Sequence, residues 1–316
     1  MFEGGAGVVQ RYSRVRVVVC AKDNTWRQIL EATEKLGITD TIFTSSLDAM
    51  LGMLCDGVVD LLVCDFSLLG HTLMDAAHKI RRKMGGRNPF VLLIVTSETP
   101  DADTLRALIN AGIDDFLSAP FSVERLVAGI EKFAQGRRRR FVASYDYVGP
   151  TRRAPVRDQQ DPSSLIEVPN TLLSKVVHDL GDTELQRMID VAGVELEDRQ
   201  GETRANQMHR LARELCEGWR AGEEEAVTLE RMARLREIAT DFIARSASTA
   251  PPQLLNFIKM LLVLIDRTQQ NGIDQSDTDM QLLDGLTQAI RRALTVERNA
   301  VALMGEIIEA VASHHH

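Results

Sequence analysis

The sequence predicts two parts: a doubly wound α/β domain with a five-stranded parallel sheet, followed by an all-α helical bundle. Three observations lead to this prediction. Five short apolar runs alternate with segments of helical spacing as far as Gln135. A basic, Pro-containing stretch follows, and beyond Leu165 the apolar residues recur at helical spacing alone. The chain of 316 residues is also longer than one average domain.

The predicted strands are short apolar runs rich in Val, Ile, Leu and Phe. Between them, apolar residues recur three and four positions apart, which is typical of helices that cover a sheet. Such a repeat needs right-handed crossovers and gives a parallel sheet covered on both faces. The runs are Val15–Cys20, Thr41–Thr44, Asp60–Cys64, Phe90–Val95 and Asp115–Ser118.

Asp65 directly follows one of these runs, in the stretch VDLLVCDFS. Open parallel sheets bind their ligands at the carboxyl ends of the strands, so an acid there is a candidate chemical centre. Two further strand ends carry distinctive residues, Thr96 in LLIVTSETPD and Phe116 in AGIDDFLSAPFSVERL. Together the three segments resemble the receiver domains of bacterial two-component response regulators, over about residues 14–135. The resemblance implies phosphoryl transfer from a histidine kinase to Asp65, with Thr96 and Phe116 as switch residues.

The pocket departs from the family at three positions. In the family, two acids after the first strand help the phospho-acceptor to hold Mg²⁺, and a lysine before a proline pairs with the phosphorylated aspartate. Here these positions are Ala21, Lys22 and Ala119, the last followed by Pro120. Because Mg²⁺ takes oxygen ligands and neutralises phosphoryl charge, this loss argues against phosphorylation. Asp23 is the remaining acid nearby, and a one-residue shift would make it a single metal ligand.

The charges of the altered pocket favour a different arrangement. Lys22 and Asp65 sum to zero without a metal ion. An opposite charge a few ångströms away favours an ionised carboxylate, so we expect a Lys22–Asp65 ion pair that locks the site. The alternative is that Lys22 points into solvent.

These residues predict a non-enzymatic bacterial signal-transduction protein, an atypical response regulator with a pseudo-receiver. We expect no cofactor and no metal, with Mg²⁺ needed only if Asp65 is a working phosphorylation site. The expected partners are other signalling proteins, such as a histidine kinase or a phosphotransfer protein. One alternative is a true phospho-acceptor that uses Asp65.

Residues 137–164 are predicted to be a linker, basic at first and then polar. The arginines could cap the last receiver helix, where cations meet the helix dipole. They could instead bind an anion such as cyclic di-GMP, since guanidinium groups bind phosphate bidentately. The sequence box that usually completes a cyclic di-GMP site is absent. The candidate residues are Arg137, Arg138, Arg139, Arg140, Arg152 and Arg153.

Residues 165–313 are predicted to form the helical domain, which suits a bundle. Residues 167–313 hold 16 Lys and Arg against 25 Asp and Glu, a balance that repels DNA. The segment LLNFIKMLLVLID is apolar on nearly all sides, which favours a homodimer. The predicted helices are Leu172–Val177, Leu185–Val194, Met208–Trp219, Leu229–Ile243, Leu254–Ile265 and Met280–Val311.

His178 in KVVHDL resembles the phospho-accepting helix of phosphotransfer proteins, but Gly181 and Asp182 break the helix just after it. A solvent-facing histidine is therefore the favoured interpretation. Residues 1–13 are predicted to be an extension before a receiver-like domain at 14–136, and residues 314–316 a tag remnant. The four scattered cysteines predict reduced thiols in the cytoplasm, and no run is long enough to span a membrane.

Overall fold

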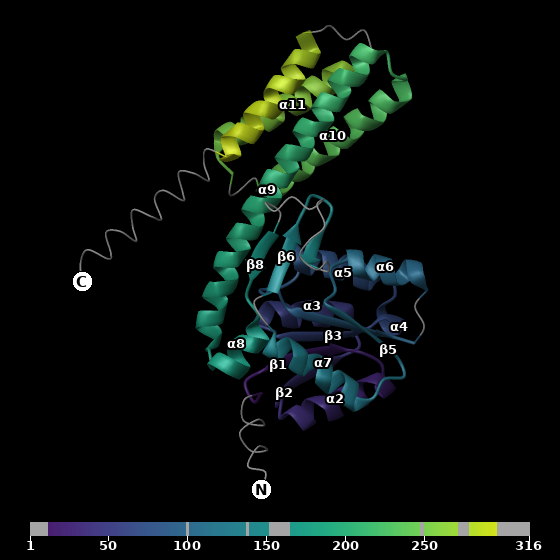
Figure 1. Ribbon diagram of the computed structural model, residues 1–316, viewed down its shortest axis with the longest axis vertical. Coiled ribbons are helices and arrows are strands. Elements are labelled where there is room, and N and C mark those ends of the chain that lie inside the picture. The colour runs from purple at the N-terminus through teal and green to yellow at the C-terminus, as the bar shows by residue number, and fades with distance from the viewer. Residues whose placement is uncertain are drawn as a thin grey trace, which may run out of the picture. The chain divides into compact units, whose positions relative to one another are not determined.

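The computed structural model describes residues 12–98, 101–136, 139–151, 165–246, 250–270 and 278–295. The chain divides into two compact units, one up to Glu197 and the other from Asp198. The 40-residue helix α9 (Asp182–Ala221) contributes to both. Figure 1 labels the elements in chain order. Among the helices described, none is long and apolar enough to cross a membrane.

A five-stranded parallel sheet forms the middle of the first unit, in the order β2-β1-β3-β4-β5. The order reverses direction after β1, which places helices on both faces and confirms the predicted doubly wound domain. Every residue of β3 and β4 is buried, as expected for strands covered on both sides. The strands are β1 (Arg16–Cys20), β2 (Asp40–Thr44), β3 (Leu61–Asp65), β4 (Leu92–Ser97) and β5 (Asp115–Ser118).

The helices that alternate with these strands begin and end at ordinary capping residues. Ser46, Asp101 and Ser122 each accept a hydrogen bond from the backbone N–H three residues later. Gly37 ends α2 with φ of 78°, a left-handed conformation that favours glycine. The helices are α2 (Asp23–Leu36), α3 (Leu47–Asp56), α4 (Phe66–Leu69), α5 (Thr72–Arg81), α6 (Ala102–Asn110) and α7 (Val123–Gln135).

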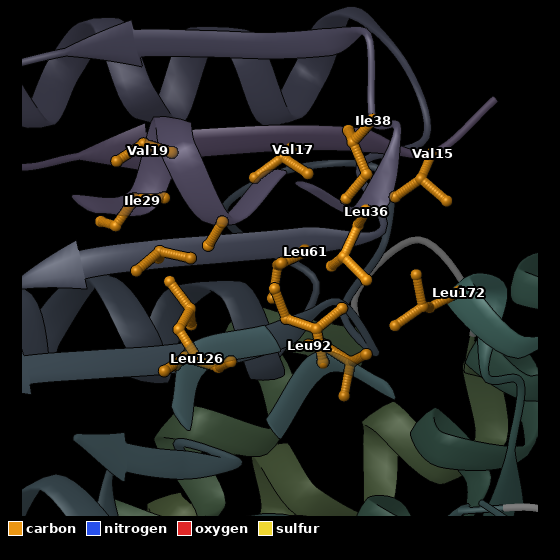
Figure 2. Close-up of a cluster of buried hydrophobic side chains, with 14 of the residues drawn as sticks. Val15, Val17, Val19, Ile29, Leu36, Ile38, Leu61, Leu92, Leu126 and Leu172 are labelled. Atoms are coloured by element: carbon orange, nitrogen blue, oxygen red, sulfur yellow. The ribbon is translucent and has the colours of Figure 1, made fainter. Parts of the chain in front are cut away.

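Two apolar clusters lie on the two faces of the sheet, because successive residues of a strand point to opposite sides. Val17 and Leu61 belong to the cluster that includes Leu126 of α7, and Figure 2 shows these side chains together. Val18 and Leu62 belong to the other cluster, which lies against α3 and α5. The alternation fixes which face each strand residue covers.

A second, antiparallel sheet follows, in the order β7-β6-β8. Its strands are β6 (Arg139–Ala143), β7 (Val148–Pro150) and β8 (Leu165–Val168). The first two lie in the segment for which the sequence predicted a linker, and β8 lies at the start of the predicted helical domain. The strands form because Phe141, Val148 and Ile166 bury a common apolar face with Phe90. Strands of three to five residues among arginines give too weak a periodic pattern to be recognised.

Helix α8 (Thr171–His178) packs against the α/β domain and not in a separate bundle. Leu172 and Val176 join the first apolar cluster of the sheet, and Figure 2 shows Leu172 beside it. Asn170 caps α8 and donates to the Phe133 carbonyl oxygen of α7 at 2.8 Å. The first compact unit therefore extends well beyond the predicted receiver boundary at residue 136.

The second unit is helical, as predicted. The predicted helices at 185–194 and 208–219 are one helix, α9, because no proline or capping residue interrupts the sequence between them. Helices α10 (Glu225–Ser246) and α11 (Pro252–Gln270) follow, and α11 begins at the predicted proline. A last helix is described over 278–295, so the predicted continuation to Val311 lies outside the described residues. Met260 and Val263 are exposed, so α11 is not covered on all sides within the described part of the unit.

Candidate functional site

A pocket of about 650 Å³ lies at the carboxyl ends of the parallel strands. Asp65 at the end of β3 is paired in register with Thr96 of β4, so the two side chains meet at this edge. Ala21 follows β1, and Ala119 follows β5. The topology thus brings together the strand-end residues that the sequence singled out. The lining residues are Ala21, Lys22, Thr25, Ser45, Asp65, Ser67, Thr96, Ser97, Glu98 and Ala119.

Asp65 is only 4% exposed, and both its carboxylate oxygens are engaged. Oδ1 accepts a hydrogen bond from the Ser67 backbone N–H at 2.8 Å, which makes Asp65 the N-cap of α4. Oδ2 accepts a hydrogen bond from the Thr25 hydroxyl at 3.3 Å. The carboxylate is therefore held in a fixed orientation by α4 and by α2.

The predicted ion pair between Lys22 and Asp65 is not formed. Lys22 lines the pocket but is exposed, and its backbone is extended at the N-cap position of α2. The Asp65 oxygens already have donors in Thr25 and Ser67, and holding a long lysine in one geometry costs side-chain entropy. The alternative expectation, a solvent-facing Lys22, is the correct one. Asp23 begins α2, but its side chain lies outside the described residues.

Thr96 and Phe116 differ in their surroundings. The Thr96 hydroxyl is buried in the pocket wall and has no hydrogen-bond partner in the described structure. Phe116 on β5 is half-buried and packs beside the cluster that contains Leu108. Because Phe116 is paired in register with Val95 and not with Thr96, the two switch candidates occupy neighbouring positions on adjacent strands.

Ala119 presents a methyl group to the pocket at the position where the family has a lysine. Its backbone N–H donates to the Ser97 carbonyl oxygen at 2.7 Å, and its peptide bond to Pro120 is cis. In the described lining, Lys22 is the one cationic side chain and Asp65 and Glu98 are the carboxylates. No group of three acidic, histidine or cysteine side chains gathers anywhere in the described ranges. These donors do not fit the Mg²⁺ site that the resemblance implies.

Only two of the six candidate arginines for anion binding are described, and both have protein partners. Arg139 is almost fully buried, pairs with the Asp114 carboxylate and donates to the Phe90 carbonyl oxygen. Arg140 is exposed and lies 3.8 Å from Glu167. Arg139 is thus a structural residue and not a ligand-binding one. Arg137, Arg138, Arg152 and Arg153 lie outside the described residues.

Asp114 also holds a second arginine that the sequence analysis missed. Arg81 is completely buried and donates to Asp114 Oδ2 at 2.8 Å. Its other donors reach the Gly112, Pro89 and Val91 carbonyl oxygens, each at 2.8 Å. Burial lowers the pKa of Arg81, and the Asp114 carboxylate opposes that shift. No sequence pattern marked Arg81, since it stands in the basic run RRKMGGR, which is typical of a solvated loop.

A buried ion pair joins α8 to the parallel sheet and was also missed. The Lys175 ammonium lies 2.9 Å from Asp60 Oδ2 and 2.9 Å from Asp182 at the start of α9. The Arg16 backbone N–H donates to the same Asp60 oxygen at 2.8 Å. Burial raises the pKa of Asp60, and the charge of Lys175 lowers it in part. Lys175 stands in KVVHDL, the motif considered for phosphotransfer.

His178 is exposed and is the last residue of α8. Asp179 follows with φ of 53°, which ends the helix. The helix break that the sequence predicted is therefore present, and the continuous helix of a phosphotransfer protein is not.

Residues 17–131 match the family model of the response regulator receiver domain. No curated protein matches the chain. Three solved structures are similar. The orphan response regulator HP1043 of H. pylori is 21% identical, covering 38% of this chain and 95% of that chain, with a TM-score of 0.33. A response regulator from Thermotoga maritima is 23% identical over 37% and 95%, with a TM-score of 0.34. Full-length FixJ from B. japonicum is 13% identical over 88% and 98%, with a TM-score of 0.31.

Proposed function

Since residues 17–131 form a response regulator receiver domain, we propose that this chain is a signal-transduction protein with a pseudo-receiver. A pseudo-receiver keeps the receiver fold but does not depend on phosphorylation of its aspartate. The composition of the Asp65 pocket carries the proposal. Ala21 and Ala119 line that pocket with methyl groups where the family has a metal-binding acid and a lysine.

The physical argument concerns charge. Phosphoryl transfer onto a carboxylate develops negative charge that cations must stabilise. Losing one preorganised stabilising group typically costs about 3 kcal/mol, or roughly a hundredfold in rate. Here Lys22 is the single cation of the described lining, and it is exposed to solvent. Phosphorylation of Asp65 is thus too slow to serve as the switch.

The proposed mode of action is binding to other proteins, without enzymatic activity and without a cofactor. The helical second unit offers the variable surface, and the receiver domain offers a second one. The partners we propose are other signalling proteins, such as a histidine kinase or a phosphotransfer protein, in the cytoplasm. We propose that the chain itself is a homodimer.

One observation favours a second candidate, a true phospho-acceptor. The buried Thr96 hydroxyl lacks a partner and is in register with Asp65, so it could donate to a phosphoryl oxygen there. A nucleotide sensor is not favoured, because Arg139 is bound to Asp114 and Arg140 lies near Glu167.

Labelling with acetyl phosphate and Mg²⁺ separates the two candidates. We expect the full chain to remain unlabelled under conditions that label an ordinary receiver. A rebuilt pocket, Ala21→Asp with Lys22→Asp and Ala119→Lys, is expected to gain labelling, and adding Asp65→Asn to it is expected to abolish that gain. Labelling of the unaltered chain that disappears in Asp65→Asn would establish the true phospho-acceptor instead.

A further inference from the structure

An exposed apolar stripe runs along the first half of α9. Met188 is 38% exposed, Val191 72% and Val194 56%. The three residues are spaced three apart, so they lie on one face of the helix. Side chains of this size usually cover something, and nothing in the described part of the first unit covers them.

A groove of about 550 Å³ lies beside the stripe, between α8 and α9. Its apolar walls include Leu173 and Leu180, and Met188 and Val191 of the stripe form part of it. A projecting row and a hollow therefore lie together on one surface. An interface between two identical copies related by a two-fold axis needs this arrangement, since each copy must supply both the projection and the hollow.

The charged residues on this face have a matching symmetry about Val191. Arg187 and Glu195 are both exposed, and each lies four residues from Val191. In an antiparallel pair of helices with its two-fold axis at Val191, the residue n before Val191 meets the residue n after it. Arg187 then meets Glu195 of the partner subunit, and Met188 meets the partner's Val194. Both contacts occur twice.

From this symmetry we propose that a second copy of the chain packs antiparallel on α9, with the two-fold axis at Val191. The inference rests on the homodimer of the proposed function and assigns it a surface. The next residues outward on this face are Glu184 and Asp198, which are both acidic. The helices must therefore cross at an angle that separates these residues, as packed helices commonly do. An unrelated partner helix would have no reason to match this symmetrical spacing.

Cysteine cross-linking of the full chain tests the axis, because a residue on a two-fold axis lies next to its own copy. The exposed native Cys55 is first replaced by serine. In that background we expect Val191→Cys to form covalent dimers under mild oxidation. Val263→Cys on α11 is the matched control, a valine 68% exposed in the other unit, and is expected to remain uncrosslinked.

Charge reversal tests the pairing, with light scattering or sedimentation as the readout of the dimer. Arg187→Glu and Glu195→Arg are each expected to weaken dimerisation roughly tenfold, since each change places two like-charge pairs in the interface. The double variant is expected to recover most of the affinity because it inverts both pairs without breaking them.

The outcomes distinguish this interface from the proposed function. A dimer in which Val191→Cys does not cross-link, or in which both cysteines cross-link alike, overturns the α9 interface and leaves the homodimer standing. A monomer at all concentrations overturns both, and the groove is then open to a different protein. Neither result affects the pseudo-receiver, which the acetyl phosphate experiment tests separately. Failure of the double charge variant to recover also counts against the interface.

Discussion

The Lys175 ammonium of α8 lies 2.9 Å from the Asp60 carboxylate, which directly precedes the strand that ends at Asp65. Both side chains are almost completely buried. Lys175 also contacts Asp182, so a single side chain joins β3, α8 and the start of α9. The segment after the receiver is thus fixed to the parallel sheet at the edge opposite the Asp65 pocket.

Removing Lys175 is expected to destabilise the first unit strongly. Lys175→Met leaves the Asp60 carboxylate buried and unpaired, and we expect the free energy of unfolding to fall by about 3–5 kcal/mol. Asp60→Asn with Lys175→Met should cost less than the sum of the single changes, as a double-mutant cycle would show. Urea unfolding followed by Trp26 fluorescence, with Trp219→Phe as background, reports on the first unit alone. A loss below about 1 kcal/mol for Lys175→Met would contradict the account.

Two adjacent arginines offer a matched comparison. Arg139→Ala removes one partner of the buried Asp114 and two hydrogen-bond donors, so we expect a loss of about 3–5 kcal/mol in unfolding free energy. Arg140→Ala removes an exposed contact at 3.8 Å from Glu167 and should cost less than about 1 kcal/mol. Equal losses in the same urea experiment would show that Arg139 is not part of the core.

Gly112 lies where the α/β domain meets the antiparallel sheet. Its φ is 91°, and a Cβ there would stand 2.7 Å from the Val148 carbonyl oxygen. We expect Gly112→Ala to destabilise the first unit by more than about 1 kcal/mol. Gly52→Ala is the control, since it lies within α3 with no atom within 4 Å, and it should stabilise the helix by about 0.5–1 kcal/mol. Tolerance of Gly112→Ala would mean that the two sheets do not approach this closely.

The thiols should differ in reactivity and in their response to pH. Burial raises the pKa of Cys20 to about 11, and it raises the pKa of Cys64 and of Cys216 as well. Since the thiolate is the reactive form, these three are protonated at pH 8 and become more reactive only as the pH rises toward their pKa values. A disulfide reagent at pH 8 should label one thiol per native chain, Cys55, and four after unfolding. Rapid labelling in Cys55→Ser would contradict this.

The sequence predicted the parallel sheet because its strands are long apolar runs between amphipathic helices. The predicted run at 115–118 matches β5, and the others differ from the observed strands by one or two residues at their ends. The position of Asp65 opposite Thr96 followed from the same pattern, since parallel strands end at one edge.

What the sequence did not predict depends on contacts between distant segments. Arg139 and Arg81 looked like surface charges, and only the fold shows that both meet Asp114. Lys175 drew attention as a neighbour of His178, but its partner Asp60 is 115 positions earlier in the chain. Lys22 was expected at Asp65, whereas Thr25 and Ser67 occupy the carboxylate oxygens.

The central claim is that Asp65 is not a working switch, and a beryllofluoride titration with Mg²⁺ tests it most directly. Beryllofluoride bound to an aspartate mimics its phosphorylated form, and amide NMR would follow Thr96 and Phe116. We predict no saturable shift at either residue, because Ala21, Lys22 and Ala119 supply neither the metal ligands nor the lysine. Saturable shifts at both residues that vanish in Asp65→Asn would contradict the pseudo-receiver and establish Asp65 as a phospho-acceptor.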